Sequence, residues 1–380
     1  MPRVYLDHHA ATPLSPRARA AMASAAEDAW ANASSAHAEG RAAKARLEAA
    51  RRAIAAAVGC AAADVVLTGG GTEACNLGVL GFGAPAREAV ERLVVVTSNL
   101  AHPAMEQAVA ALGARGAEIH TLALHARPLD ELPELVARPR PAGAAWMLAL
   151  PAVCHETGTI LDPVEIARAL PECTVVVVDA CQALGKLPSH RFSAPNWAVA
   201  ISGAKIGASA GSGALVAPRR LELAPRLLGG SQERGRRAGT PDVAAHAGFA
   251  AACAGLDERL SSASRIGALR DQLERGLVAL GAAVNGAETE RVATVTNVSF
   301  AGWRKATLVA ALDLEGIAVS AGAACSSGLD GPSPAILSLH PDEPWRAERC
   351  VRFSLGPETT ERDIELTLAA LDRVLARRPG

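Results

Sequence analysis

Short apolar runs alternate along the first two thirds of the chain with longer segments that are rich in helix-forming residues. The runs lie at residues 64–68, 93–97, 146–150, 175–178 and 198–201. Each run has the length of one strand, and apolar residues at successive positions are typical of strands that helices cover on both faces. This alternation predicts an α/β fold with a mainly parallel sheet.

Two helices carry recognisable boundary signals. A capping hydroxyl, Ser15, precedes Pro16, and this pair predicts a helix start. Residues 41–58 are rich in strong helix formers, and Gly59 predicts the end of that helix.

The last third of the chain has a different pattern. Residues 295–300, 317–320 and 350–354 predict short strands, and a final helix is predicted from about Thr360. One face of that helix is apolar, with Ile364, Leu368, Leu371 and Leu375. The pattern indicates a smaller α+β unit.

A chain of 380 residues is long for a single core. We therefore predict a large domain of residues 15–257 and a small domain made of residues 1–14 and 258–380. The first residues are expected to pack with the C-terminal unit. The active site is expected in a cleft that the two domains share.

Composition and charge exclude several classes of protein. The formal net charge is −1, and no run of Lys or Arg forms a basic tail, so nothing favours a nucleic acid or an anionic membrane as a partner. The first seven residues lack the apolar core of a signal peptide, and no apolar run is long enough to span a bilayer. We expect a cytoplasmic protein.

The cysteines show no metal-binding spacing. The eight lie apart, at positions 60, 75, 154, 173, 181, 253, 325 and 350. They form no CxxC pair and no zinc-like cluster with histidine, so we predict no metal site. Most have apolar neighbours and are expected to be small buried hydrophobes.

Cys325 is the exception among them. Its neighbours at 323–328 carry no bulky apolar side chain. A structural cysteine needs apolar packing partners, whereas an exposed thiol can act as a nucleophile. We therefore expect Cys325 to be reactive.

Polar residues that follow the predicted strands are the candidates for chemistry, because open α/β sheets bind ligands beyond the carboxyl ends of their strands. Gly71 and Thr72 begin a helix after a strand and could cradle a phosphate, although a plain tight turn explains them as well. Asp179 could pair with a protonated ring nitrogen or could simply cap a helix.

Two basic residues also end or occupy predicted strands. Lys205 follows the strand at 198–201 and either reaches solvent or serves as a desolvated amine for Schiff-base chemistry. Arg352 alternates with apolar residues, so it either faces solvent or binds a carboxylate with two hydrogen bonds. The Arg- and Gly-rich segment 232–240 is either a solvated loop or an anion site.

Together and in this order, these segments resemble the cysteine desulfurases, which are fold-type I enzymes dependent on pyridoxal 5'-phosphate (PLP). The matching motifs include residues 5–13 (YLDHHAATP), 32–37, 101–103, 155–158, 179–182 and 352–356. The resemblance covers nearly the whole chain. It implies a large domain with a mainly parallel seven-stranded sheet and a smaller α+β C-terminal domain.

The resemblance also assigns roles around the cofactor ring. Lys205 would carry PLP and then move protons, and His102 would stack on the ring and assist acid/base steps. Asp179 would face the ring nitrogen, and Gln182 the phenolic oxygen. His155 would lie beside the cofactor and the substrate carboxylate.

Further roles concern the phosphate and the substrate. Gly71, Thr72 and Ser202 would bind the phosphate, joined by Thr240 from the second subunit of a homodimer. Arg352 would hold the carboxylate of L-cysteine. Cys325 would attack the substrate sulfur, giving alanine and a persulfide for an acceptor protein, such as an iron-sulfur scaffold or a tRNA-thiolation protein.

Two positions depart from the family pattern. Ala204 stands where the family usually has histidine, and residues 207–213 lack its Pro-Lys pair, so one phosphate contact is expected to be missing. Losing one charge-assisted hydrogen bond weakens binding by about 1–3 kcal/mol. His155 replaces an asparagine, and a histidine there is expected to titrate near neutral pH.

Two other functions compete with cysteine desulfuration. A selenocysteine lyase or another PLP-dependent β-lyase would keep the cofactor but would not need the Cys325 thiol. A non-catalytic regulatory or binding protein on the same fold would be supported only by Ala204 and His155.

Overall fold

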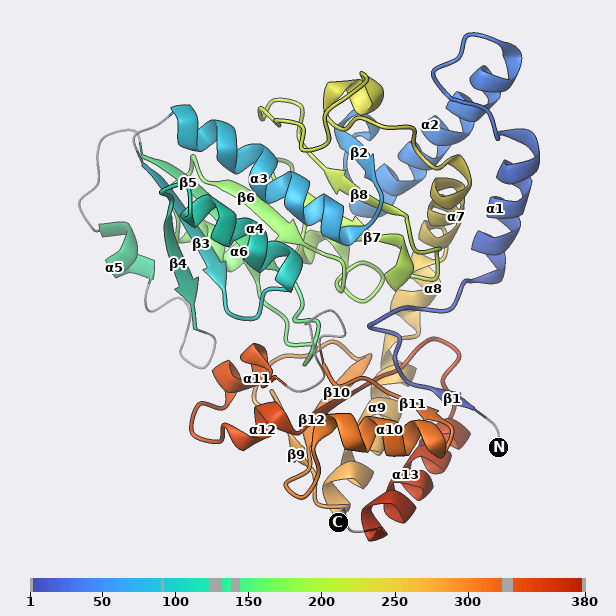
Figure 1. The fold of residues 1–380 in the computed structure, drawn as a ribbon, viewed down its shortest axis with the longest axis vertical. Coiled ribbons are helices and arrows are strands. Elements are labelled where there is room, and N and C mark those ends of the chain that lie inside the picture. Colours follow the sequence, from blue (N-terminus) through green and yellow to red (C-terminus); the bar gives the residue numbers. More distant parts are fainter. Residues whose placement is uncertain (1–2, 90–91, 124–131, 138–143, 323–330, 378–380) are drawn as a thin grey trace.

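The chain folds as an α/β protein with two lobes (Figure 1). A computed structural model describes residues 3–89, 92–123, 132–137, 144–322 and 331–377. The strands of the upper lobe are β2 (Val65–Thr68), β3 (Leu93–Ser98), β4 (Glu118–Leu122), β5 (Ala145–Pro151), β6 (Val175–Asp179), β7 (Ala198–Ser202) and β8 (Gly213–Val216). Its helices are α1 (Pro16–Asp28), α2 (Ala38–Val58), α3 (Gly71–Ala89), α4 (Pro103–Gly113), α5 (Leu132–Ala137), α6 (Pro163–Arg168) and α7 (Val243–Cys253).

The seven strands form one sheet in the order β2-β8-β7-β6-β5-β3-β4. The strands from β7 to β4 pair in parallel, whereas β8 is antiparallel to both of its neighbours. The prediction of a mainly parallel seven-stranded α/β fold is therefore confirmed.

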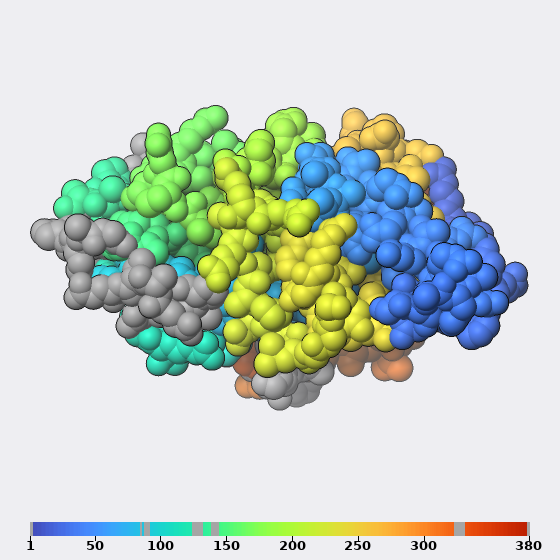
Figure 2. Space-filling view, turned by 90° about the horizontal axis from the view of Figure 1, so that it is seen from above, coloured from blue at the N-terminus to red at the C-terminus, as the bar shows by residue number. Residues whose placement is uncertain are grey.

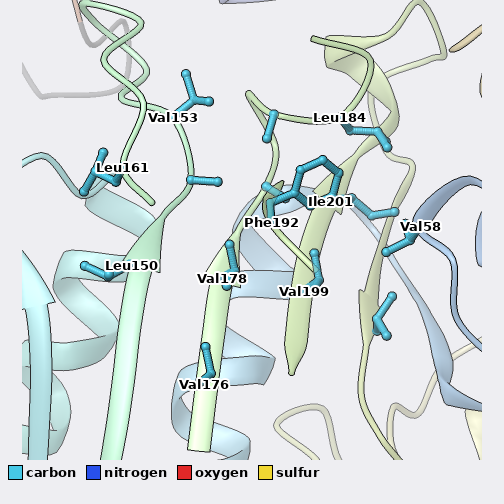
Figure 3. Packing of buried hydrophobic residues seen from close by; sticks show 14 of the residues in the cluster. Val58, Leu150, Val153, Leu161, Val176, Val178, Leu184, Phe192, Val199 and Ile201 are labelled. Carbon is cyan, nitrogen blue, oxygen red and sulfur yellow. The ribbon is translucent and has the colours of Figure 1, made fainter. Parts of the chain in front are cut away.

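Both faces of this sheet are buried, as the apolar runs predict. Along β6, Val176 and Val178 belong to the hydrophobic cluster on one face, while Val177 belongs to the cluster under α3 and α4 on the other. Figure 3 shows Phe192 close to Ile201 in the first cluster. Successive side chains of a strand point to opposite faces, so a strand covered on both sides must be apolar throughout.

The predicted start of α1 and the predicted end of α2 are confirmed. Ser15 caps α1 by accepting a hydrogen bond from the Ala18 N–H, with proline at the next position. Gly59 ends α2 at φ 78°, a left-handed conformation that favours glycine. This helix begins three residues before the predicted segment, and the His37 side chain caps it.

The lower lobe is smaller and contains the C-terminal third of the chain (Figure 1). Its strands are β1 (Val4–Tyr5), β9 (Ala283–Val284), β10 (Val295–Ser299), β11 (Ile317–Ala318) and β12 (Cys350–Ser354). The remaining helices are α8 (Leu256–Ser261), α9 (Ala263–Ala279), α10 (Lys305–Leu314), α11 (Pro334–Leu339), α12 (Trp345–Glu348) and α13 (Glu361–Ala376).

A separate hydrophobic cluster holds this lobe together. Val4 and Leu6 from the start of the chain pack in it with Ile364 and Leu371 of α13. β1 pairs in parallel with β11, and β10 lies between β12 and β9. α13 begins at a capping box formed by Thr360 and Asp363. The predicted domain limits, 15–257 against 1–14 with 258–380, stay a prediction.

Among the described residues, no helix is both long and apolar enough to cross a membrane.

Candidate active site

Most of the predicted site residues surround one cavity of about 200 Å³ between the upper lobe and β12 of the lower lobe. The predicted residues that line it are Gly71, Thr72, His102, His155, Asp179, Gln182, Ser202, Lys205 and Arg352. All except Arg352, which lies within β12, come from the carboxyl ends of strands in the large sheet and from the turns that follow, where an open α/β sheet binds its ligands. Their individual roles stay predictions.

Lys205 is placed by a short turn after β7. It ends the 3-10 turn η3 (Gly203–Lys205), and its Nζ donates to the Ala10 carbonyl over 2.6 Å. The residues after β1 also hold the turn itself, because the Thr12 hydroxyl donates to the Lys205 carbonyl over 3.1 Å. The amine therefore lies at a wall of the cavity, held from the N-terminal segment.

Asp179 ends β6 and is buried. Its Oδ1 accepts the Cys181 N–H over 2.9 Å, but a turn and not a helix follows, so the helix-cap interpretation is wrong. Asp179 lines the cavity, and its role there stays a prediction. Gln182 is buried nearby and donates its Nε2 to the His9 carbonyl, while its Oε1 accepts from Lys186 Nζ, each over 2.8 Å. The amide orientation of Gln182 is therefore fixed from both ends.

The start of α3 is packed too closely for any residue but glycine at position 71. A Cβ on Gly71 would lie 2.5 Å from Cys181 Sγ and 3.2 Å from the Ser202 Cβ. The free N–H groups of the helix start therefore face the cavity without side-chain bulk beside Thr72 and Ser202, which is an arrangement suited to a phosphate.

Two histidines meet at right angles in the cavity wall. The rings of His102 and His155 lie 4.9 Å apart with an angle of 76° between their planes. His102 caps α4, and its Nδ1 accepts the Ala104 N–H over 3.1 Å, so in the neutral ring the proton sits on Nε2. Burial lowers the pKa of His102, and the nearby Lys205 and Arg352 act in the same direction.

His155 is buried, and neither of its ring nitrogens has a hydrogen-bond partner among the described residues. Burial, with His102 and Arg352 nearby, holds the pKa of His155 well below its usual value. The expectation that this histidine titrates near neutral pH is therefore wrong, because the desolvated ring stays neutral. A histidine whose two ring nitrogens lack a hydrogen-bond partner among the described residues is suited to a polar ligand.

Arg352 does not face solvent. It is only 2% exposed, and it donates to the His155 carbonyl over 2.9 Å and to Asp7 Oδ1 over 2.8 Å. Its Nε has no partner among the described residues. The solvent-facing interpretation is wrong: the guanidinium is buried, lines the cavity and is positioned by these two contacts.

Two predicted residues lie elsewhere. Cys325 lies outside the described residues. Thr240 is exposed and is not among the described residues that line the cavity of its own chain. Two ion pairs hold the Arg-rich segment 232–240 to the upper lobe. Arg237 pairs with Glu73 over 2.7 Å, and Glu233 pairs with Arg51 over 2.6 Å.

Two thiols that line the same cavity could not be predicted from the sequence. Cys75 and Cys181 bring their sulfurs and an Asp179 oxygen within 4.8 Å of one another. A contact with Cys181 and burial raise the pKa of the Cys75 thiol well above its usual value. The Cys75 contact lowers the pKa of Cys181, but burial and the Asp179 carboxylate together outweigh it, so the pKa of this thiol is also raised. The two cysteines lie far apart in the sequence, so only the fold reveals the cluster.

These residues fit PLP, the cofactor that the sequence resemblance implies. The close-packed glycine at the start of α3 suits the phosphate, and the buried Asp179 suits a protonated ring nitrogen. Lys205 lines the same cavity with its amine at the wall. Ala204 in place of histidine and the missing Pro-Lys pair in residues 207–213 remain the departures on the phosphate side.

Known proteins similar to this chain agree with that fit. The family model for class-V aminotransferases matches residues 4–367. An IscS-like cysteine desulfurase of Mycobacterium tuberculosis is 35% identical, covering 98% of this chain and 96% of that protein. A cysteine desulfurase of Gluconacetobacter diazotrophicus is 34% identical, covering 99% and 94%. A solved structure of a NifS-like protein superposes with a TM-score of 0.87 at 27% identity, covering 99% of this chain and 100% of that one.

Proposed function

Since the chain belongs to the class-V aminotransferase family, we propose that it acts as a PLP-dependent cysteine desulfurase. The observation that carries the proposal is the convergence of the family's motif residues on one cavity, in a chain that matches cysteine desulfurases over its full length. The substrate is L-cysteine, and the products are L-alanine and a persulfide on Cys325.

The bound cofactor supplies an electron sink for the carbon next to the substrate's amino group. Gly71, Thr72 and Ser202 hold its phosphate, and Asp179 holds the ring nitrogen in the protonated form. Gln182 donates from Nε2, whose direction is set because Oε1 is occupied by Lys186. Lys205 binds the cofactor covalently through Nζ.

Two groups move protons in this proposal. Lys205, once its amine is released, takes up and returns protons at the substrate carbon. His102 carries its proton on Nε2, since Nδ1 is occupied by the Ala104 N–H. The lowered pKa keeps this ring neutral at physiological pH, so it can donate or accept.

The substrate carboxylate is held by Arg352, which lines the cavity and whose guanidinium is fixed by its contacts with the His155 carbonyl and Asp7. His155 lies beside it as a neutral hydrogen-bonding group. The Asp7 carboxylate is already paired with Arg352, so the arginine is positioned before the substrate arrives.

The sulfur step requires Cys325 as a thiolate. Its sulfur attacks the substrate sulfur, so an S–S bond forms while the Cβ–S bond of the substrate breaks. The electron pair of the broken bond stays with the organic fragment, which takes up a proton and leaves as alanine. Cys325 keeps the transferred sulfur as a persulfide, which then passes to an acceptor protein.

We also propose a homodimer in which Thr240 reaches the partner's phosphate site. Thr240 is exposed, and the same surface segment carries Leu228, 84% exposed. The acceptor is proposed to be an iron-sulfur scaffold or a tRNA-thiolation protein, and the location is proposed to be cytoplasmic. The proposed division into domains at residue 257 is supported by the lower-lobe cluster, whose buried members lie only at residues 4–6 and 266–374. The upper-lobe cluster also takes in Val292, Val295 and Ala335, which pack across this division.

The selenocysteine lyase alternative keeps every residue of the cavity and differs only in the need for a thiol. The non-catalytic alternative loses its support from His155, because a neutral buried histidine still offers hydrogen bonds to a ligand.

The test is formation of alanine and sulfide from L-cysteine with a reductant, by PLP-loaded wild type, Cys325→Ala and Cys173→Ala. Cys173 is exposed and serves as the matched control. We expect turnover in the wild type and the control, and a loss of about 100-fold or more in Cys325→Ala. Full activity in Cys325→Ala would favour a lyase, and PLP-loaded wild type that makes no alanine would refute a desulfurase.

A further inference from the structure

A second, smaller cavity borders Lys205. Its volume is about 30 Å³, and its walls include His8, Thr12, Lys186, Lys205 and Arg259. A single water needs about 10–15 Å³ of such space, so the cavity has room for two or three particles of that size. It is far too small for a cofactor or an amino acid.

The walls of this cavity are positively charged. Lys186 and Arg259 both line it, and among the described residues no carboxylate does. Lys186 donates to the neutral amide of Gln182, and Arg259 has no ion-pair partner in the described part of the chain. Burying like charges without a counter-ion is costly.

The pKa values of both cations are lowered in this environment. Burial lowers the pKa of Lys186 to about 7, and Arg259, Lys205 and Arg352 add to the effect. Burial also lowers the pKa of Arg259, against which only Glu358 acts. Glu358 is exposed and does not line the cavity. Among the described residues, no carboxylate forms an ion pair with Lys186 or Arg259.

His8 is a further polar residue in the wall of this cavity. It is 7% exposed, borders the same cavity, and its Nδ1 has no partner among the described residues. Burial lowers the pKa of His8 to about 4, so the ring is neutral and can donate from one nitrogen.

We propose that this cavity binds one small inorganic anion, of the size of chloride, between Lys186 and Arg259. The anion supplies the missing negative charge, and the N–H groups of Lys186 and Arg259 that have no other acceptor donate to it.

Anion binding would also affect Gln182, which lines the larger cavity. An anion beside Lys186 favours its protonated form, which donates to Oε1 of Gln182. The Gln182 amide lines the larger cavity, so the anion would hold its Nε2 in the donating direction there. The site is therefore a binding site in its own right that also positions Gln182, and its existence does not depend on the proposed reaction.

Bromide locates the site directly, because its anomalous X-ray scattering distinguishes it from water. We expect crystals of the PLP-loaded protein soaked in sodium bromide to show one bromide per chain between Lys186 and Arg259. It should be absent in Lys186→Met and present in the control Arg17→Met, whose arginine pairs with Glu258 outside this cavity. Water alone in the wild-type cavity would overturn the proposal.

A solution measurement covers the case in which a variant does not crystallise. Thermal unfolding is compared in chloride and in gluconate at equal ionic strength. At chloride near ten times its Kd, we expect the wild-type Tm to rise by about 2 °C. Lys186→Met and Arg259→Met should show no such rise, whereas Arg17→Met should. An equal response of the wild type and both cavity variants would contradict a specific site.

Discussion

The ion pair between Arg51 and Glu233 links α2 to the Arg-rich segment in a fully buried place. Glu233 accepts from both terminal nitrogens of Arg51, over 2.6 and 2.8 Å, and from the Leu67 N–H over 2.8 Å. Glu233 and Arg234 hold left-handed backbone angles, with φ of 49° and 60°. This one carboxylate therefore fixes a strained segment to the first strand of the sheet.

Replacing Glu233 with Gln removes the buried one of the two carboxylates that pair with Arg51, and leaves only Glu48, whose Oε1 lies 3.2 Å from Arg51 Nε. Because the cation stays buried, we expect the free energy of unfolding to fall by about 3 kcal/mol. Urea unfolding measures it. Glu365→Gln is the control, since the Glu365–Arg362 pair is exposed and is worth about 0.5 kcal/mol. Equal losses in the two variants would refute the importance of burial.

His8 makes the protein sensitive to acid. Its pKa in the folded state is about 4, while an unfolded chain has the ordinary value of 6.5. The unfolded state therefore binds more protons between these values, so stability falls as the pH decreases from 6.5 towards 4.

Between pH 7.5 and pH 5 this residue alone should remove about 2 kcal/mol of stability. In His8→Asn that part of the pH dependence should disappear, while His190→Asn, at an exposed histidine, should keep the wild-type profile. Urea unfolding at the two pH values measures it. A His8→Asn profile parallel to that of the wild type would show that His8 does not titrate as described.

At the scale of elements, the start of α3 decides whether the cofactor cavity stays open. Gly71→Ala would place a Cβ 2.5 Å from Cys181 Sγ, at the floor where the phosphate is expected. We expect the affinity for PLP to fall by about tenfold or more, measured by titration of the visible absorbance of bound PLP.

A second substitution tests the cause. Cys181→Ala removes the atom that meets the new Cβ, so the double variant should recover part of the lost affinity. Gly302→Ala is the control, because nothing lies within 4 Å of a Cβ there. If the double variant binds PLP no better than Gly71→Ala, the clash with Cys181 is not the reason.

Two strands of the large sheet, β6 and β4, show which elements can be predicted from the sequence and which cannot. β6 is buried on both faces, so its apolar run predicts it directly. β4 was not predicted, because it lies at the edge of the sheet and carries Glu118, His120 and Thr121 among its five residues. A half-exposed edge strand has too few apolar residues to be recognised.

Some residues of the site could likewise be predicted from the sequence, and others could not. Residues that directly follow strands, such as Asp179 and Lys205, could be predicted because the sheet topology brings strand ends together. Lys186, Cys75 and the neutral state of His155 could not be predicted, since each depends on neighbours far away in the sequence and on burial.

At the scale of the whole molecule, one face carries features that a lone subunit does not explain. Leu227 and Leu228 are 47% and 84% exposed, and the Leu227 carbonyl accepts the Ala238 N–H over 3.3 Å. The exposed leucines therefore lie beside the segment that leads to Thr240. In Figure 2 this segment, in yellow, occupies the middle of the face between the green and blue parts of the chain.

Exposed apolar side chains next to a predicted phosphate ligand favour a two-fold contact, in which each subunit completes the other's cavity. Leu228→Glu would place a charge in that contact, so we expect a monomer in analytical ultracentrifugation and a PLP affinity about tenfold lower or more, with unchanged circular dichroism. Leu314→Glu, at a leucine 86% exposed in the lower lobe, should stay dimeric and keep PLP. A Leu228→Glu protein that remains a dimer would place the contact elsewhere. A monomer that binds PLP as tightly as the wild type would show instead that Thr240 of the partner subunit is not needed for the phosphate.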